Sequence, residues 1–295
     1  MEMTIERKDE SQMLNRKSQV PVCLTIAGLD PSGGAGIIAD IKTFSAFGCF
    51  ATAAITSLTF QNTTGVFGAV HQTAESIRGQ IEPIIEDFTV AALKTGMLPN
   101  REVIEEIARI VKKNRLKNYV VDPVVRSTSG FDLIDDAALE VLIETLFPLA
   151  DLVTPNLPEA ERITRMKIEN TRDIERAAKM MQSFGAKNVL IKGGHFFDGK
   201  RKKEKGEGEI KNRIARDFLF IGDDLKVYET AFIETTATHG TGCALAAAIT
   251  ANLALGKNLI EAVEAAKKYV TEAIRTAPNL GRGHSPINLL QRPEK

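Results

Sequence analysis

The amino-acid sequence predicts an α/β fold with a single domain, in which a central, mostly parallel sheet carries helices on both faces. Short apolar runs typical of β-strands alternate with helical segments along most of the 295-residue chain, as in doubly wound parallel sheets. The run 119–125 is apolar apart from Asp122, which is expected of a strand buried on both faces. The length fits one large α/β domain with appendages.

The order of the elements follows from the same alternation. The chain starts with a strand at 20–26, a glycine-rich turn at 30–36 and a helix that stops near Gly48. The next strands are expected at 51–60, 91–95, 119–125, 152–154 and 188–191, and the next helices at 75–88, 101–113, 135–147 and 171–184. Two antiparallel strands follow at 216–221 and 225–233, and the last helices are expected at 240–255 and 259–277.

The domain is expected to span 20–290, between two tails. The polar segment 1–19 mixes both charges and lacks the apolar core of a secretion signal, so it is expected to be a disordered tail. The segment 291–295 forms a short C-terminal tail. Within the domain, the segment 200–213 is dense in Lys, Arg, Glu and Gly, which predicts a solvated basic loop; a lid over the site is the alternative.

The composition favours a small-molecule site. The 38 basic and 38 acidic side chains balance, which argues against a nucleic acid or an anionic membrane as the main partner. The three cysteines are an odd number at wide spacing, as expected of a cytoplasmic protein, and the four histidines lack the spacing of zinc ligands. The longest apolar run is too short to span a membrane.

The segment Thr238-His239-Gly240-Thr241-Gly242-Cys243 joins a glycine-rich turn to an alanine-rich helix. The free N–H groups and the positive dipole end of such a helix attract an anion. The same field stabilises a thiolate, so the pKa of Cys243 is expected to fall below its free value of about 8.5, making this residue a candidate base. The alternative is that the glycines form a plain turn and that Cys243 is a small buried residue.

Four polar residues follow predicted strands and are expected to meet at the carboxyl edge of the sheet, where α/β proteins bind ligands. Lys192 would balance the charge of a phosphoryl group held at 240–243. Asn156 and Glu159 are three residues apart at a strand-to-helix junction and are expected to reach a metal, with Asp122 beside them. Because these ligands are oxygens, the expected ion is Mg²⁺.

Each of these residues also has a purely structural interpretation. Asn156 could cap a helix that begins at Pro158, and Glu159 could be an ordinary acid of its first turn. Asp122 could merely end a strand, and Lys192 could be a surface lysine. Two nucleotide-binding patterns are not supported: no Gly-x-x-x-x-Gly-Lys-Ser/Thr is present, and the glycine-rich turn does not match Gly-x-Gly-x-x-Gly.

Seven motifs follow one another along the chain: Ala27-Gly28-Leu29-Asp30-Pro31-Ser32-Gly33-Gly34-Ala35-Gly36, Gln61-Asn62-Thr63, Lys94-Thr95-Gly96-Met97, Val121-Asp122-Pro123-Val124, Thr154-Pro155-Asn156-Leu157-Pro158-Glu159-Ala160, Lys192-Gly193-Gly194-His195 and 238–243. In this order they closely resemble the motifs of hydroxymethylpyrimidine/phosphomethylpyrimidine kinases, the thiamin-biosynthetic branch of the ribokinase-like superfamily. The resemblance extends over residues 21–290.

The resemblance implies a ribokinase-like fold and an enzyme that uses ATP and Mg²⁺. Its substrates would be 4-amino-5-hydroxymethyl-2-methylpyrimidine and the monophosphate of this compound, and its product would be the diphosphate used to make thiamin phosphate. Gln61 would bind the pyrimidine through its amide, in a pocket lined by Gly28, Asp40, Met97 and Val124. The alternative for Asp40 is a solvated position on the first helix.

The resemblance also assigns the ATP side of the site. Asn156 and Glu159 match an Asn-x-x-Glu element that serves metal and phosphate binding in the superfamily. Asp122, Lys192 and Lys267 would flank the phosphates, and Glu159 and Asp122 would hold the metal.

Cys243 takes the place of an aspartate found in most ribokinase-like sugar kinases. The resemblance puts it nearest the hydroxymethyl group, as the general base, beside the anion site of Gly240, Thr241 and Gly242. Relatives also suggest a homodimer. Two alternatives remain open: a pyridoxal kinase of the same superfamily, and a pyrimidine-binding sensor without catalysis. The chain departs from the common pattern at Leu29, where serine is usual, and in its longer basic insertion.

Overall fold

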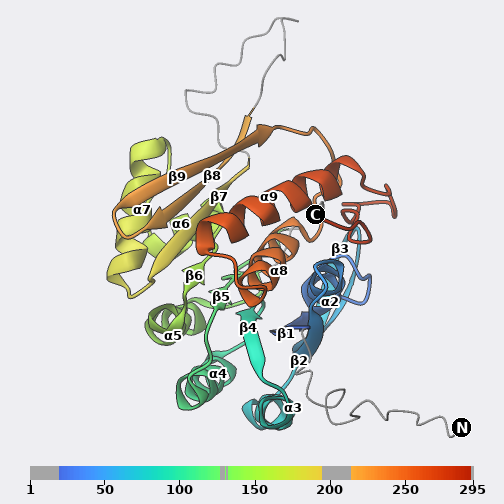
Figure 1. Cartoon of the computed structure of the whole chain (residues 1–295), viewed down its shortest axis with the longest axis vertical. Coiled ribbons are helices and arrows are strands. Elements are labelled where there is room, and N and C mark those ends of the chain that lie inside the picture. The colour runs from blue at the N-terminus through green and yellow to red at the C-terminus, as the bar shows by residue number, and fades with distance from the viewer. Residues whose placement is uncertain (1–19, 127–129, 131, 195–213, 294–295) are drawn as a thin grey trace, which may run out of the picture.

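The computed structural model describes residues 20–126, 130, 132–194 and 214–293. In these residues nine strands form one sheet, in the order β3-β2-β1-β4-β5-β6-β7-β8-β9 (Figure 1). The predicted tail at 1–19 and the predicted basic loop at 200–213 lie outside the described part. The strands are β1 (Val22–Leu29), β2 (Phe50–Asn62), β3 (Gly65–His71), β4 (Val90–Thr95), β5 (Tyr119–Val121), β6 (Leu152–Val153), β7 (Asn188–Gly193), β8 (Ile214–Ile221) and β9 (Asp224–Ala231).

The sheet is mostly parallel, as predicted. β2, β1, β4, β5, β6 and β7 run parallel to one another, while β3 at one edge and β8 and β9 at the other are antiparallel to their neighbours. The chain adds β2 on one side of β1 and β4 on the other. The carboxyl ends of the strands around such a reversal leave a crevice, which is where open α/β sheets bind their ligands.

Helices cover both faces of the sheet (Figure 1). Residues of α3 to α7 form one apolar cluster with the sheet, and residues of α2, α8 and α9 form a second. No helix in the described ranges has both the length and the apolar character needed to cross a membrane. The helices are α2 (Gly36–Ala46), α3 (Ala74–Asp87), α4 (Arg101–Asn114), α5 (Asp136–Leu146), the 3-10 turn η1 (Phe147–Leu149), α6 (Leu157–Thr164), α7 (Thr171–Ser183), α8 (Thr241–Ala254) and α9 (Leu259–Arg275).

Helix α8 is the central helix of its layer. It packs against α2, α9, β1 and β4. Its residues from Ala244 to Asn252 are all buried, and five of them are alanines, whose small side chains let the helix approach its neighbours closely. Its first turn therefore has a fixed position relative to the ends of the strands.

Two elements differ from the sequence-based expectation. β5 ends at Val121 rather than continuing to Val125, because the chain turns at Asp122, whose carbonyl accepts a hydrogen bond from the Val124 N–H at 2.8 Å. Pro123 between them has no N–H to donate to a sheet. The second difference is at the β3 edge of the sheet. β2 extends to Asn62 and pairs with β3, an edge strand that was not predicted from the sequence.

Candidate active site

A cleft of about 930 Å³ lies at the carboxyl edge of the sheet. Most of the residues predicted for the site line it: Gly28, Gln61, Met97, Asp122, Val124, Asn156, Glu159, Lys192, Gly240, Thr241, Gly242, Cys243 and Lys267. These residues come from distant parts of the sequence and from both helix layers. The fold therefore brings residues of separate motifs together in one cleft. Asp40 is the exception and does not line the cleft.

The anion site predicted at the start of α8 has the expected backbone. Gly240 is the N-cap residue with φ 83°, and no side chain in the described part of the chain caps the first turn. A Cβ atom on Gly240 would come within 1.8 Å of the Gly34 carbonyl oxygen, so the glycine-rich turn after β1 packs directly on this backbone. On the cleft side, a Cβ atom on Gly242 would lie 3.2 Å from Lys192 Nζ. An ammonium group therefore faces the open helix start, and the two together favour an anion.

The two glycine-rich segments are joined by a side-chain hydrogen bond that was not expected from the sequence. Asp30 Oδ2 lies 2.7 Å from His239 Nε2, and the carboxylate also accepts hydrogen bonds from the Ser32 and Ala35 N–H groups. Burial raises the pKa of Asp30, but the hydrogen bonds from His239 and Ser32 outweigh it and hold the pKa below its usual range. Asp30 and His239 both lie inside the quoted motifs, but two motifs so far apart in the sequence give no indication that these side chains meet.

Lys192 lies between two carboxylates. Its Nζ is 2.8 Å from Asp122 Oδ1 and 3.9 Å from Glu159 Oε2, and it is largely buried. Thr154 donates a further hydrogen bond to Asp122 Oδ1. Burial lowers the pKa of Lys192, but the Asp122 and Glu159 charges outweigh it and raise the pKa above its usual range. Lys192 is thus a fixed cation of the cleft, not the surface lysine of the alternative interpretation.

Asn156 does cap helix α6, as the alternative interpretation held. Its Oδ1 accepts from the Glu159 N–H at 2.9 Å, and Glu159 Oε2 accepts from the Asn156 N–H at 2.7 Å, which is a complete capping box. The helix begins at Leu157, one residue before the expected Pro158. Burial raises the pKa of Glu159 to about 7, although Lys192 opposes the shift. The same carboxylate that caps the helix is therefore costly to ionise.

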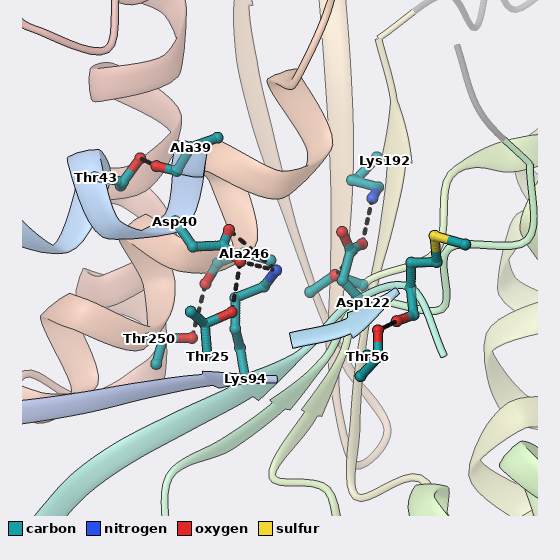
Figure 2. A network of polar contacts seen from close by, with 12 residues as sticks. Thr25, Ala39, Asp40, Thr43, Thr56, Lys94, Asp122, Lys192, Ala246 and Thr250 are labelled. Carbon is teal, nitrogen blue, oxygen red and sulfur yellow. Dashed lines mark hydrogen bonds and ion pairs between the residues drawn. The ribbon is translucent and has the colours of Figure 1, made fainter. Parts of the chain in front are cut away.

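Asp40 lies below the cleft rather than on its wall, which corrects the prediction that it lines the pyrimidine pocket. Its carboxylate is fully buried and pairs with Lys94 at 2.9 and 3.1 Å, while Thr25 donates a hydrogen bond at 2.6 Å (Figure 2). Lys94 does line the cleft, and the sequence analysis assigned it no role. Its one signal in the sequence is a lysine within the otherwise apolar run of β4.

The environment of Cys243 differs from the prediction. Burial raises the pKa of its thiol to about 11, with the Asp40 and Asp122 carboxylates adding to the shift. The positive charge of Lys94 and a hydrogen bond to the Gly36 backbone favour the thiolate but do not outweigh the burial. The residue is therefore a neutral thiol, and the expected low pKa at the helix start is wrong.

The predicted pyrimidine pocket is bounded by the ends of β1, β2 and β4. A Cβ atom on Gly28 would lie 2.8 Å from Met97 Sδ, so this glycine leaves room for the methionine. The Met97 carbonyl is fixed by a hydrogen bond from Thr56 at 2.7 Å. Gln61 lines the same cleft near the end of β2, and its side-chain amide makes no hydrogen bond to the described residues. An unpaired amide at this position suits recognition of a donor and an acceptor on a ring.

Lys267 enters the cleft from α9 and is anchored by Asp217 of β8 through a short hydrogen bond. The other oxygen of Asp217 accepts from the Gly193 N–H at 3.0 Å. Lys267 is therefore linked to the end of β7, the strand that carries Lys192.

The comparisons with known proteins agree with this geometry. A family model described as phosphomethylpyrimidine kinase matches residues 30–288. A hydroxymethylpyrimidine/phosphomethylpyrimidine kinase of Haemophilus influenzae is 41% identical over 92% of this chain and 97% of its own. The crystal structure of a phosphomethylpyrimidine kinase from Clostridium difficile 630 is 44% identical, with a TM-score of 0.72 over 86% of this chain and 99% of that one.

A third relative has a different printed activity. The pyridoxal kinase of Staphylococcus aureus, solved in complex with AMP-PCP and pyridoxal, is 30% identical and has a TM-score of 0.79 over 92% of this chain and 94% of its own. The fold is therefore shared with both activities, whereas the family model and the relatives of higher identity named above carry the pyrimidine name. On this evidence the chain belongs to the phosphomethylpyrimidine kinase family.

Proposed function

We propose that this protein is an ATP-dependent kinase that phosphorylates 4-amino-5-hydroxymethyl-2-methylpyrimidine and then the monophosphate of this compound, giving the diphosphate for thiamin biosynthesis. The observation that carries the proposal is one cleft lined by two different sets of groups. Gln61 and Met97 offer a ring-binding wall, while the start of α8 and Lys192 offer an anion site. A phosphoryl group held at the anion site and a hydroxymethylpyrimidine bound at the wall would share this cleft.

The transfer itself asks for positioning and charge stabilisation. The substrate hydroxyl oxygen forms a bond to the γ-phosphorus, the bond from that phosphorus to ADP breaks, and ADP leaves with the electron pair. We assign Cys243 as the base: its thiol first releases its own proton to solvent, and the resulting thiolate takes the hydroxyl proton. Gly240, Thr241 and Gly242 would supply backbone N–H groups to the transferred phosphoryl group, and Lys192 would balance its charge.

The remaining polar residues would hold ATP. Asp122, Asn156, Lys192 and Lys267 converge on the cleft from four different elements or junctions, as a phosphate chain requires. Asn156 uses its Oδ1 to cap α6, so its amide nitrogen is the group we assign to the nucleotide. Lys267 would reach the phosphates from the salt bridge with Asp217.

Mg²⁺ fits the chemistry of two carboxylates in this cleft. Asp122 and Glu159 both lie within 4.0 Å of the same Lys192 ammonium group. Among the residues that the structure describes, no group of three or more His, Cys, Asp or Glu side chains is arranged to hold a metal. Waters and phosphate oxygens would complete the coordination, as Mg²⁺ prefers. When bound, the ion would neutralise phosphate charge.

We further propose a cytoplasmic homodimer. β2 and β3 carry exposed apolar side chains on the face away from the cleft, including Leu58 and Val70, which are cross-strand neighbours, and Phe60. Exposed apolar groups gathered on one sheet face mark contact surfaces. Three free cysteines are consistent with a reducing compartment.

The test is ATP consumption by the purified protein with Mg²⁺ and three alternative substrates, namely hydroxymethylpyrimidine, its monophosphate and pyridoxal, with products resolved by mass. We expect both pyrimidines to be converted and pyridoxal to turn over slowly. Preference for pyridoxal would favour the second candidate, a pyridoxal kinase, which the likeness to the Staphylococcus aureus enzyme supports. Binding of the pyrimidine without turnover would favour a sensor.

A further inference from the structure

A buried ion pair beneath the cleft joins helix α2 to strand β4. Lys94 on β4 and Asp40 on α2 are both fully inaccessible to solvent, and the ammonium group contacts both carboxylate oxygens (Figure 2). Thr25 on β1 donates to the same carboxylate. Replacing such a pair by apolar groups is often neutral or stabilising, so its presence calls for a reason beyond stability.

This ion pair adjoins the first turn of α8. Helix α8 packs against both elements that carry the pair, α2 and β4. Lys94 and Cys243 line the same cleft, and each alters the proton affinity of the other: the ammonium charge lowers the pKa of the thiol, and the thiolate raises the pKa of the lysine. Figure 2 shows Ala246, one turn after Cys243 on α8, beside the Asp40–Lys94 pair, so Lys94 lies close to the turn that carries the sulfur.

The other charged groups around Cys243 act in both directions. Asp40 and Asp122 disfavour the thiolate, since both are carboxylates. Lys192 interacts with Cys243 as well and is the second cation of the cleft, but it is already paired with Asp122 at 2.8 Å. Among the charges that act on the thiol, that of Lys94 has the largest effect.

We propose that Lys94, fixed by Asp40, is the positioning residue that provides the charge partner of the Cys243 thiolate. This inference deepens the proposed function and rests on it only for the role of Cys243 as base. Burial alone holds the sulfur as a thiol, so a base at this position needs a nearby cation at the moment of proton transfer. Asp40 keeps the lysine protonated and directs it, which gives this buried aspartate a function away from the pyrimidine.

The test is the rate at which iodoacetamide alkylates Cys243 in the ligand-free protein at pH 7 to 9, followed on the peptide that carries it. Below the pKa of the thiol this rate is proportional to the thiolate fraction. We expect Lys94→Met to slow alkylation about tenfold or more, equivalent to a shift of about one pH unit. Asp40→Asn is expected to slow it as well, because the buried lysine loses the carboxylate that keeps it protonated.

Thr25→Val is the matched control, because it removes a hydrogen bond from the same carboxylate and leaves both charges in place. We expect its rate to stay near that of the wild type. A purely structural ion pair would behave differently: loosening the site would admit water and speed alkylation in both charge variants. A Lys94→Met rate equal to or above the wild-type rate would therefore overturn the proposal. If Lys94→Met does not fold, Lys94→Gln answers the same question.

Measuring kcat and KM of the Lys94→Met variant distinguishes a failure of this proposal from a failure of the base role of Cys243. If Lys94→Met slows alkylation and lowers kcat with KM for the pyrimidine unchanged, both hold. If it slows alkylation and leaves kcat unchanged, Lys94 still sets the thiolate fraction, and the assignment of Cys243 as base fails instead.

Discussion

Cys243 carries the sharpest prediction at the scale of single residues. Its sulfur lies at the start of α8 in a cleft that also holds Lys94 and Lys192. We expect Cys243→Ala to lower kcat by about 10²- to 10⁴-fold, the usual contribution of a general base, while KM for hydroxymethylpyrimidine changes little. Steady-state kinetics on a variant with wild-type thermal stability measure both values. An unchanged kcat would exclude the base role.

Glu159 makes the stability of the protein depend on pH. Its pKa is about 7 in the folded protein against an ordinary value of 4.5, so between these values the folded state binds more protons than the unfolded state. The free energy of unfolding therefore gains a stabilising contribution that is complete below pH 4.5 and is lost as pH rises to 7, amounting to about 3 kcal/mol at most.

Glu159→Gln is expected to remove this dependence and to retain the helix cap, since its amide oxygen can still accept from the Asn156 N–H. The measurement is urea unfolding at several pH values between 4.5 and 7, compared with wild type. Glu144→Gln, at an exposed position of α5, is the control for loss of one carboxylate. If the difference in free energy of unfolding between wild type and Glu159→Gln stays constant over this pH range, the shifted pKa of Glu159 is contradicted.

At the scale of elements, the start of α8 depends on a close approach of two backbones. Gly240 has φ 83°, and a Cβ atom there would lie 1.8 Å from the Gly34 carbonyl oxygen. Gly48 has a similar φ of 79° with nothing within 4 Å of its Cβ position. An alanine at Gly48 would therefore add only backbone strain, whereas an alanine at Gly240 would add backbone strain and a steric clash.

We expect Gly48→Ala to cost about 1 kcal/mol through the left-handed conformation alone. Gly240→Ala is expected to cost about 3 kcal/mol or more and to lower kcat, because the glycine-rich turn must move away from α8. Chemical denaturation of both variants gives the two values. If the two variants lose the same free energy of unfolding, the glycine-rich turn after β1 moves away from α8 at no cost, and its packing does not fix the anion site.

The sequence predicted the elements better than the contacts between them. The parallel strands and most helices follow from local apolar patterns, and their predicted ends agree with the structure within a few residues. β3 was missed because its pairing with β2 through a hairpin decides its structure, and Gly65 and Gly68 weaken its own pattern. Asp40 was assigned to the cleft wall by the resemblance; it lies outside the seven motifs, and nothing in the sequence indicates which side of α2 it faces.

The hydrogen bond between Asp30 and His239 shows the same limit. The two residues are separated by 209 positions, and neither segment signals a partner. Only the packing of α8 against the start of α2 brings them together. Contacts between buried polar residues of distant segments were thus the part of the site that local patterns could not predict.

The sheet has two edges, and the proposed homodimer forms at only one of them. β3 forms one edge and β9 the other. Val70 on β3 is 50% exposed and Val227 on β9 is 39% exposed, so both tolerate a polar residue in the monomer. They differ in their surroundings, because Val70 has the exposed Leu58 as its cross-strand neighbour, while Val227 has the buried Phe218.

We expect Val70→Glu to convert the dimer to a folded monomer, because a carboxylate inside an apolar interface would lose its hydration. The same Val→Glu change at Val227 is expected to leave the dimer intact, since its cross-strand neighbour Phe218 is buried and Leu225 is the exposed apolar side chain beside it on β9. By contrast, β2 and β3 together expose Leu58, Phe60, Phe67 and Val70. Light scattering after gel filtration gives the mass of each variant, and the 32.2 kDa chain sets the monomer value. A wild-type monomer would exclude the dimer, and a dimer dissociated only by Val227→Glu would move the contact to the β9 edge.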